Sequence, residues 1–482
     1  MEFKNFHHGA SPVAHLNALT EVGNEGHYSV GVDINVLTPG ILTQGPGLAN
    51  LTNGTDAGAM AEAINFIMDR PAADGQTYGM GPTRLFRIGT DTLTSGGSPS
   101  WPRSITSAAD GESCVEFFGR LKYFYNTSSA GDFGDYDLAS TFDDDYGSTV
   151  PTGAGALENA PHPCAKKEDI LVFGNGRYFG TFVNSITTLS RQKLDFGTNT
   201  QVADVAFHAN QWWIAVNEGI AAGTNRMEAS LYLYDGAAID SILFDQVGIG
   251  VHRIGWILPM NGVVYVCWRD LTNSINYVGF VNGRRLEVLG AFTGNLPTYE
   301  KKTIYQNFIL FVSSGSIFAI GSAHPDFPVA LSQLADGGET TDGGLAAPFG
   351  TPMIASVTGS TRRIATFSGR VTTSDWRSIV IPTVDAEGNY GFIDKIVVLT
   401  NNLGSGASCA LTVQANQAQT TSSTMTINTT DRRRHVFTSR DINLGARMED
   451  FRIRLDWSGG STANPVDIRR IFVKGHYISA GY

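Results

Sequence analysis

The sequence predicts an all-β protein: an irregular β-propeller (residues 51–370) followed by a C-terminal antiparallel β-sandwich (371–482) and preceded by an extended N-terminal arm (1–50). Strand–turn–strand units recur through the propeller region, and a period-two alternation marks the C-terminal region. The 482 residues include 55 glycines, and only 16% are charged, against about 25% in an average globular protein. This composition suits many short strands joined by tight turns.

The N-terminal arm shows little periodicity and contains two turn dipeptides, Pro39-Gly40 and Pro46-Gly47. We expect it to be extended and to supply a closing strand or reach a neighbouring subunit. The segment that follows, DAGAMAEAINFIMD (56–69), has Ala and Met at helical spacing behind a capping residue. Its NFIMD end fits the start of a strand equally well, so helix and strand both stay open here.

Five hairpin-like units share apolar residues, a turn with Asn or Gly, and a second apolar run. They are CVEFFGRLKYFYN (114–126), DILVFGNGRYFGTFV (169–183), DVAFHANQWWIAVN (204–217), IGWILPMNGVVYVCW (254–268) and IYQNFILFVS (304–313). Asn-Gly at 175–176 and at 261–262 predicts type I′ turns, which need positive φ at both positions.

Four-strand repeats at this spacing are typical of propeller blades, which bury their faces against their neighbours. Two further units, at 63–89 and 353–369, would bring the number of blades to between five and seven. The alternative is a β-sandwich or barrel with long hairpins.

The C-terminal region alternates clearly. In FRIRLDW, residues 451–457, apolar side chains take one face and charged side chains the other. This pattern indicates half-buried antiparallel strands. Several such strands within 371–482, with turn signals between them, predict the sandwich. We expect the linker within SGRVTTSD (368–375).

The net charge of −11 argues against specific nucleic-acid binding and against an anionic membrane surface. No apolar run approaches the ~20 residues of a membrane helix, so we expect no membrane insertion. The first 16 residues carry no segment of signal-peptide length, so we expect synthesis in a cytoplasm. The four cysteines form no C-x-x-C pair. Cys267 and Cys409 lie in apolar runs, and we interpret them as buried, reduced thiols.

The sequence contains no motif of catalytic, cofactor-binding or metal-binding residues, so we expect no enzyme activity and no cofactor. The acidic stretch 131–147 is interpreted as an exposed loop, with Ca²⁺ binding as the alternative, because it lacks the EF-hand spacing. The glycines of FGNGRYFG (173–180) fit a hairpin turn better than a phosphate-binding loop, since a strand follows. His7-His8 and the PHPC run at 161–164 lie in expected loops, and His208 at a blade edge.

The tryptophans and the concentrated basic run each allow two interpretations. The tryptophans Trp212, Trp213, Trp256 and Trp268 fit core filling between blades better than stacking on sugars. The basic run DRRRHVF (431–437) fits a solvated strand, with contact to an acidic partner, such as a neighbour's acidic loop, as the alternative. Motifs of hydrolases, sialidase propellers and WD40 repeats are absent from the sequence.

Two stretches resemble virion proteins of tailed bacteriophages. They are VGVDINVLTPGILTQGPGLANLT (30–52), which precedes the hairpins, and SIVIPTVDAEGNYGFIDKIVVLTNNLGSGASCALTVQ (378–414), which opens the C-terminal region. In those proteins, a phrase like the second opens a β-sandwich appended to a propeller. Here Glu387-Gly388, Gly391, Lys395 and Val397-Val398 fit it. The resemblance names no catalytic residues.

The resemblance implies a tail component of nozzle, tip or hub type. We expect this protein to be structural, located in the virion tail, and assembled as a cyclic ring around the tail axis for DNA passage and host attachment. Expected partners are copies of itself, as a hexamer rather than a trimer, and other tail proteins. The alternatives are a glycan-binding or glycan-cleaving propeller at a tail tip or cell surface, and a secreted bacterial adhesion or lectin module.

Overall fold

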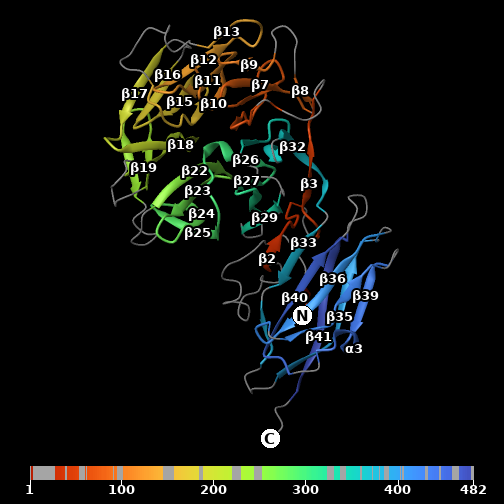
Figure 1. Ribbon diagram of the computed structural model, residues 1–482. Helices are drawn as coiled ribbons and strands as arrows, with labels where there is room; N and C mark the ends of the chain where they lie inside the picture. Colours follow the sequence, from red (N-terminus) through yellow and green to blue (C-terminus); the bar gives the residue numbers. More distant parts are fainter. Residues whose placement is uncertain are drawn as a thin grey trace. The chain divides into compact units, whose positions relative to one another are not determined.

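The computed structural model is nearly all β (Figure 1). It divides into two compact units, which are described separately: Met1–Ala49, Ser316–Gly337 and Phe367–Tyr482 form the first, and Asn50–Gly315 and Gly338–Thr366 the second. The structure describes residues 2–3, 28–37, 41–53, 60, 62–90, 92–94, 101–144, 157–183, 188–219, 229–243, 252–322, 330–336, 343–358, 361–371, 373–378, 380–384, 390–401, 403, 406–418, 420–428, 432–444, 447–458 and 466–478.

Four consecutive meanders have four antiparallel strands each. They are β10 (Asp110–Phe117), β11 (Arg120–Asn126), β12 (Gly131–Tyr136) and β13 (Phe142–Asp143); β14 (Cys164–Lys167), β15 (Ile170–Asn175), β16 (Tyr178–Val183) and β17 (Leu189–Asp195); β18 (Thr200–His208), β19 (Gln211–Glu218), β20 (Ala229–Tyr234) and β21 (Ile239–Leu243); and β22 (His252–Met260), β23 (Val263–Asp270), β24 (Ile275–Asn282) and β25 (Arg285–Phe292). The predicted hairpins 114–126, 169–183, 204–217 and 254–268 are confirmed by their strand pairing.

Three more sheets accompany these meanders. Their strand orders are β26 (Lys302–Tyr305), β27 (Phe308–Ser313), β28 (Ser316–Gly321), β29 (Ala330–Asp336); β3 (Pro46–Asn50), β32 (Thr361–Arg370), β31 (Met353–Thr358), β30 (Leu345–Ala346); and β4 (Thr52–Asn53), β8 (Thr92–Leu93), β7 (Arg84–Ile88), β6 (Thr77–Met80), β5 (Phe66–Ile67), with β9 (Arg103–Ser104) beside β7. The hairpin predicted at 304–313 corresponds to β26 and β27.

The innermost strands of the second unit contact one another in a closed cycle. β5 contacts β10, β10 contacts β14, β14 contacts β18, and β18 contacts β22. β22 contacts the 3₁₀ turn η2 (Tyr299–Lys301), which leads into β26; β26 contacts β30, and β30 returns to β5. Clusters of buried apolar side chains join each meander to the next, as where Phe124 meets Phe173 at a centroid distance of 5.0 Å. The second unit is therefore propeller-like.

The predicted turns are partly confirmed. Asn261 and Gly262 both have positive φ, 51° and 81°, as a type I′ turn needs. The turn predicted at Asn175-Gly176 is wrong by one residue, because Asn175 pairs with Tyr178 and the turn falls at Gly176-Arg177. The physical reason is that the Asn175 side chain is buried and bonded: it accepts from the Glu158 N–H at 2.6 Å and donates to the Arg191 carbonyl at 3.2 Å.

Two other expectations are settled on the described residues. Phe66–Ile67 is strand β5, so the strand alternative holds for the end of 56–69; residues 56–59 and 61 lie outside the described part. The acidic stretch is not an exposed loop at 131–136, where it forms β12. Phe133 and Tyr136 of this segment are buried in the core, and the free energy gained from their burial outweighs the preference of the acidic residues for solvent.

The first unit holds two further sheets. One has the order β1 (Glu2–Phe3), β41 (Ile468–Ile478), β35 (Tyr390–Thr400), β39 (Arg434–Thr438); the other has the order β2 (Tyr28–Val32), β33 (Ser374–Ser378), β40 (Asp450–Trp457), β36 (Cys409–Ala415), β37 (Thr420–Thr421), with β34 (Ile381–Pro382) beside β40 and β38 (Met425–Ile427) beside β36. The short helix α3 (Ser439–Ile442) follows β39. The alternation predicted for 451–457 is confirmed, since Phe451, Ile453, Leu455 and Trp457 are all buried. Three stretches of the N-terminal arm form strands, of which β3 lies at the edge of the sheet of β32.

Candidate functional site

A cluster of polar side chains lies on the innermost strands of the propeller-like unit. Its members come from η2 and β26 on one side and from β10, β18 and the segment just after β5 on the other. Residues 299–303 read Tyr-Glu-Lys-Lys-Thr and directly precede the apolar strand β27. We call the described residues Asp69, Glu112, Asp204, Tyr299, Glu300, Lys302 and Thr303 the central cluster.

Tyr299 links η2 to β10. Its hydroxyl donates to Oε2 of Glu112 at 2.7 Å and contacts the Glu112 carbonyl at 3.2 Å. Desolvation raises the pKa of the Glu112 carboxyl to about 7, the Tyr299 hydrogen bond partly opposes this shift, and the charges of Asp110 and Glu300 add to it. Glu112 is therefore close to its titration midpoint at neutral pH.

Lys302 links β26 to two other innermost strands. Its ammonium forms a salt bridge with Asp204 of β18 and donates to the carbonyl of Ile257 of β22 at 2.7 Å. Asp204 also accepts from the N–H groups of Ile257, at 2.7 Å, and Val205, at 2.9 Å. Burial raises the pKa of Asp204, while Lys302 and these N–H groups oppose the rise. Only 4% of the Asp204 side chain and 10% of the Lys302 side chain are exposed.

Asp69 extends the cluster to the sheet of β5. Thr303 donates to Asp69 Oδ1 at 2.7 Å. The Asp69 side chain reaches solvent, yet the surrounding protein desolvates the carboxyl and raises its pKa to about 6. The hydrogen bond from Thr303 and the charge of Lys302 act in the opposite direction.

Glu300 is the least satisfied carboxyl of the cluster. One oxygen accepts from the Thr298 hydroxyl, and the other, Oε2, is buried without a hydrogen-bond partner among the described residues. Desolvation raises the pKa of this carboxyl. Protonation would relieve the cost of the buried negative charge.

Taken together, these bonds tie η2 and β26 to the innermost strands of four neighbouring sheets. Chemically, the cluster could also hold or pass protons near neutral pH, because Asp69 and Glu112 titrate there. In the part of the chain that the structure describes, no group of three or more His, Cys, Asp or Glu side chains is arranged to hold a metal ion.

The sequence missed this cluster because its members come from separate strands and form no motif. The one available signal was the concentration of charge in residues 299–303 just before an apolar strand. A charged run at that position is unusual for a strand that must sit inside a sheet.

The structure separates the residues of the acidic stretch. Asp135 is fully buried and forms a salt bridge with Lys122 at 2.7 Å. Asp137 accepts hydrogen bonds from the N–H groups of residues 139, 140 and 141. Desolvation is the largest single effect and raises the pKa of Asp137, but these hydrogen bonds together outweigh it and lower the pKa to about 2. Asp144 accepts from the Thr106 N–H at 2.7 Å. Asp145 lies outside the described residues.

The other residues singled out from the sequence have structural positions. Core filling is confirmed for the tryptophans, all of which are buried: Trp212, Trp213, Trp256 and Trp268. The hairpin interpretation of FGNGRYFG is confirmed by β15 and β16. Cys267 and Cys409 are buried free thiols, as expected. His162 of the PHPC run is buried, which lowers its pKa to about 4, and His208 ends β18; His7-His8 lie outside the described residues.

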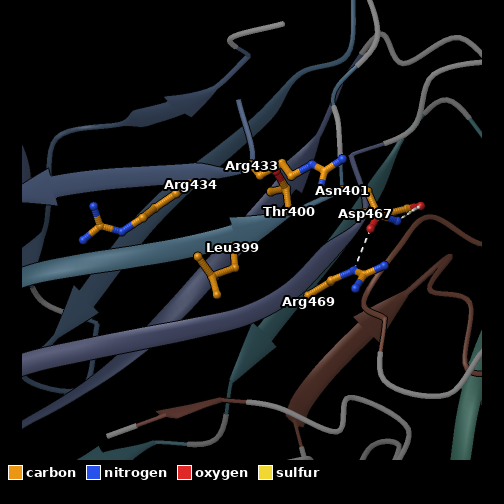
Figure 2. A pocket seen from close by; sticks show the side chains of 7 residues that line it. All are labelled: Leu399, Thr400, Asn401, Arg433, Arg434, Asp467 and Arg469. Atoms are coloured by element: carbon orange, nitrogen blue, oxygen red, sulfur yellow. Dashed lines mark hydrogen bonds between the residues drawn. The ribbon is translucent and has the colours of Figure 1, made fainter. Parts of the chain in front are cut away.

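The basic run borders a pocket of about 650 Å³ in the first unit (Figure 2). Arg433 and Arg434 at the start of β39, Arg469 of β41, and the end of β35 with the adjoining Asn401 line it. This is the second candidate site on the described residues.

The sequence matches no family model, and no curated protein matches it. Among solved structures, it is similar to the extracellular domain of the one component system BT4673 from B. thetaiotaomicron, with 11% identity, a TM-score of 0.46, and coverage of 75% of this chain and 43% of that one. It is also similar to the N-terminal domain of Nup159, with 10% identity, a TM-score of 0.40 and coverage of 67% and 96%. A third is the exo-beta-1,3-galactanase of Phanerochaete chrysosporium, with 8% identity, a TM-score of 0.31 and coverage of 67% and 98%. The chain spans less than half the length of the first of these, and similarity at this level carries no inference about function.

Among the described helices, none has the length and the hydropathy required to cross a membrane.

Proposed function

We propose that this protein is a structural component of a bacteriophage tail, of nozzle, tip or hub type, that assembles as a symmetric ring around the tail axis. The proposal rests on one observation: the polar side chains of the central cluster form hydrogen bonds and a salt bridge that connect neighbouring sheets. Tyr299 to Glu112, Lys302 to Asp204 and Thr303 to Asp69 each join different sheets. A subunit of a ring or tube needs such a stiff block.

In this proposal the chain is an irregular β-propeller followed by a β-sandwich, with the N-terminal arm contributing to both. The strands β36 and β40 support the sandwich, because each buries alternate side chains. Such alternation is typical of strands that face a second sheet on one side and solvent on the other. The phage-like phrase at 378–414 spans β35 and most of β36, which supports the tail assignment.

The proposed partners are other copies of the chain, as a hexamer rather than a trimer, and other tail proteins, with the virion tail as the location. The role is mechanical, without enzyme activity, specific nucleic-acid binding or membrane insertion. The net charge of −11 supports passage of DNA along the ring, because like charges disfavour adsorption.

Light scattering on the purified chain tests the proposal. We expect a discrete species with six times the 51.7 kDa of one chain. A protein that stays monomeric at every concentration, and that also fails to join a preassembled tail, would contradict it.

A glycan-binding or glycan-cleaving propeller is the second candidate, favoured by one observation. Asp69, just after β5, and Glu112, on β10, are carboxyl groups with pKa values raised to about 6 and about 7. A carboxyl with a raised pKa is what a glycosidase uses as general acid. A glycan array followed by a hydrolysis assay tests it: turnover that disappears in both Glu112→Gln and Asp69→Asn would favour this candidate, and no binding would remove it.

A further inference from the structure

An internal ion pair neutralises the carboxylate that lines the arginine-lined pocket, so the remaining charge around the pocket is positive. Asp467 accepts from Arg370, from the Thr43 hydroxyl at 2.7 Å and from the Asn401 amide at 3.0 Å. Asn401 in turn accepts from Arg469 Nε at 2.6 Å. The carboxylate is therefore paired with Arg370, which is not among the residues that line the pocket, while Arg434 and Arg469 contribute positive charge to the lining (Figure 2).

The strand that carries Arg434 also has an open backbone edge. β39 is the last strand in the order β1-β41-β35-β39 of the described residues. The Thr400 N–H donates to the Arg433 carbonyl at 3.0 Å, so the backbone of Arg433 faces β35. Because bonded pairs alternate along antiparallel strands, the N–H and C=O groups of Arg434 and Val436 face away from β35.

The backbone of Thr438, two residues further along β39, supports this orientation of Arg434 and Val436. The N–H of Thr438 is bonded to the carboxylate of Asp441 at 2.7 Å rather than to β35. Val436 is also one of the exposed large apolar residues, with 40% of its surface accessible. Among the described residues, β39 thus presents backbone groups without a strand partner, an exposed apolar side chain and arginine side chains together.

We propose that β39 and the arginine-lined pocket bind an extended acidic segment of another protein, which adds a strand to this sheet edge. The segment's backbone would pair with Arg434 and Val436, and its carboxylates would pair with the guanidinium groups. An acidic peptide fits better than an acidic sugar, because only a peptide complements the spaced N–H and C=O groups of the edge. The proposal does not depend on the assignment to a phage tail.

The chain's own acidic stretch does not supply this segment in its described part. Asp135, Asp137 and Asp144 are bonded within their own unit. The acidic loop of a neighbouring copy is therefore not favoured as the partner, and the proposed occupant is a segment of a different protein.

Fluorescence anisotropy of the full-length protein with a labelled peptide of about twelve residues, alternating Glu and Val, tests the proposal. We expect saturable binding whose affinity decreases as the salt concentration rises. The affinity should fall at least about tenfold in the double variant Arg434→Glu with Arg469→Glu, equivalent to about 1.4 kcal/mol. It should also fall in Val436→Pro, which removes an edge N–H group without changing the charge. The matched control Arg285→Glu, at an exposed arginine of β25, should bind like wild type, and a Lys-Val peptide should not bind.

Circular dichroism establishes that each variant is folded; if Val436→Pro is not, the arginine variants and the Lys-Val peptide still decide. Absence of binding to the Glu-Val peptide would overturn the proposal. Binding of polygalacturonate in preference to the peptide, with no effect of Val436→Pro, would also overturn it and assign the pocket to an acidic polysaccharide.

Discussion

The hydroxyl of Tyr299 donates to the carboxylate of Glu112 at 2.7 Å, across 187 residues of sequence. Tyr299 is buried in η2, and Glu112 lies on β10, so the bond joins the 3₁₀ turn before β26 to an innermost strand of the propeller-like ring. Burial, together with the charges of Glu112 and Glu300, raises the pKa of Tyr299 well above its ordinary value, which keeps the phenol protonated as the donor. The polar groups at the ring centre therefore act first as links between sheets.

Glu112 should make stability depend on pH. Its folded pKa of about 7 lies above the ordinary 4.5, so its contribution is complete below about pH 4.5 and is lost as the pH rises towards 7. Glu112→Gln, which keeps an acceptor for Tyr299, should be more stable than wild type by about 1–3 kcal/mol at pH 8 but not at pH 4. Thermal unfolding across this range measures it, with Glu168→Gln at an exposed turn as the control. An equal effect of Glu112→Gln at both pH values would refute the assignment.

Lys302 should be one of the most costly polar residues to remove. Lys302→Met leaves Asp204 buried without its counter-charge, and we expect a loss of about 3–5 kcal/mol in unfolding free energy. Arg284→Met removes an exposed pair with Asp240 and should change stability by about 0.5 kcal/mol or less. Urea unfolding of both variants makes the comparison, and similar losses in the two would show that the buried link is unimportant.

Asn217 should be a structural link between two meanders. Its amide donates to the Ile254 carbonyl at 3.0 Å and accepts from the Ile254 N–H at 2.8 Å, so β19 is bonded to β22. Asn217→Ala leaves both backbone groups buried and unpaired, and we expect a loss of about 2–4 kcal/mol. Asn282→Ala, at an exposed amide, serves as the control in the same unfolding assay. A loss no larger than that of the control would contradict the prediction.

A glycine should be required at residue 180 because the aromatic ring of Phe173 covers this position. Gly180 lies opposite Phe173 across β15 and β16, and a Cβ at residue 180 would fall 2.2 Å from the Phe173 ring. Gly180→Ala should cost about 1–3 kcal/mol through overpacking. In the double variant with Phe173→Leu the two losses should be less than additive, which a double-mutant cycle measures. Strictly additive losses in unfolding free energy would show that the Phe173 ring does not require a glycine at residue 180.

The sequence predicted the strands well because strand period and turn residues are local signals. FRIRLDW shows its buried face directly, and Asn261-Gly262 shows its turn. The Asn175-Gly176 pattern predicted the turn one residue too early, because the Asn175 side chain accepts a hydrogen bond from the Glu158 N–H. Such a contact is set by the packing of two sheets, which no local pattern encodes.

The candidate sites were harder to predict for the same reason. Asp69, Asp204 and Lys302 are far apart in sequence and meet only when the innermost strands close into a ring. The arginine-lined pocket was partly predictable, because the run at 431–437 is the concentrated basic stretch of the sequence. Arg469 and the open edge of β39 could not be added without the strand order.

Electron microscopy of the assembled, purified protein tests the central claim most directly. The account predicts rings of one fixed order, six-fold rather than three-fold, in class averages of the particles. Isolated single copies at all concentrations, together with cleavage of a glycan that depends on Glu112, would contradict the structural role and favour the glycan-cleaving candidate.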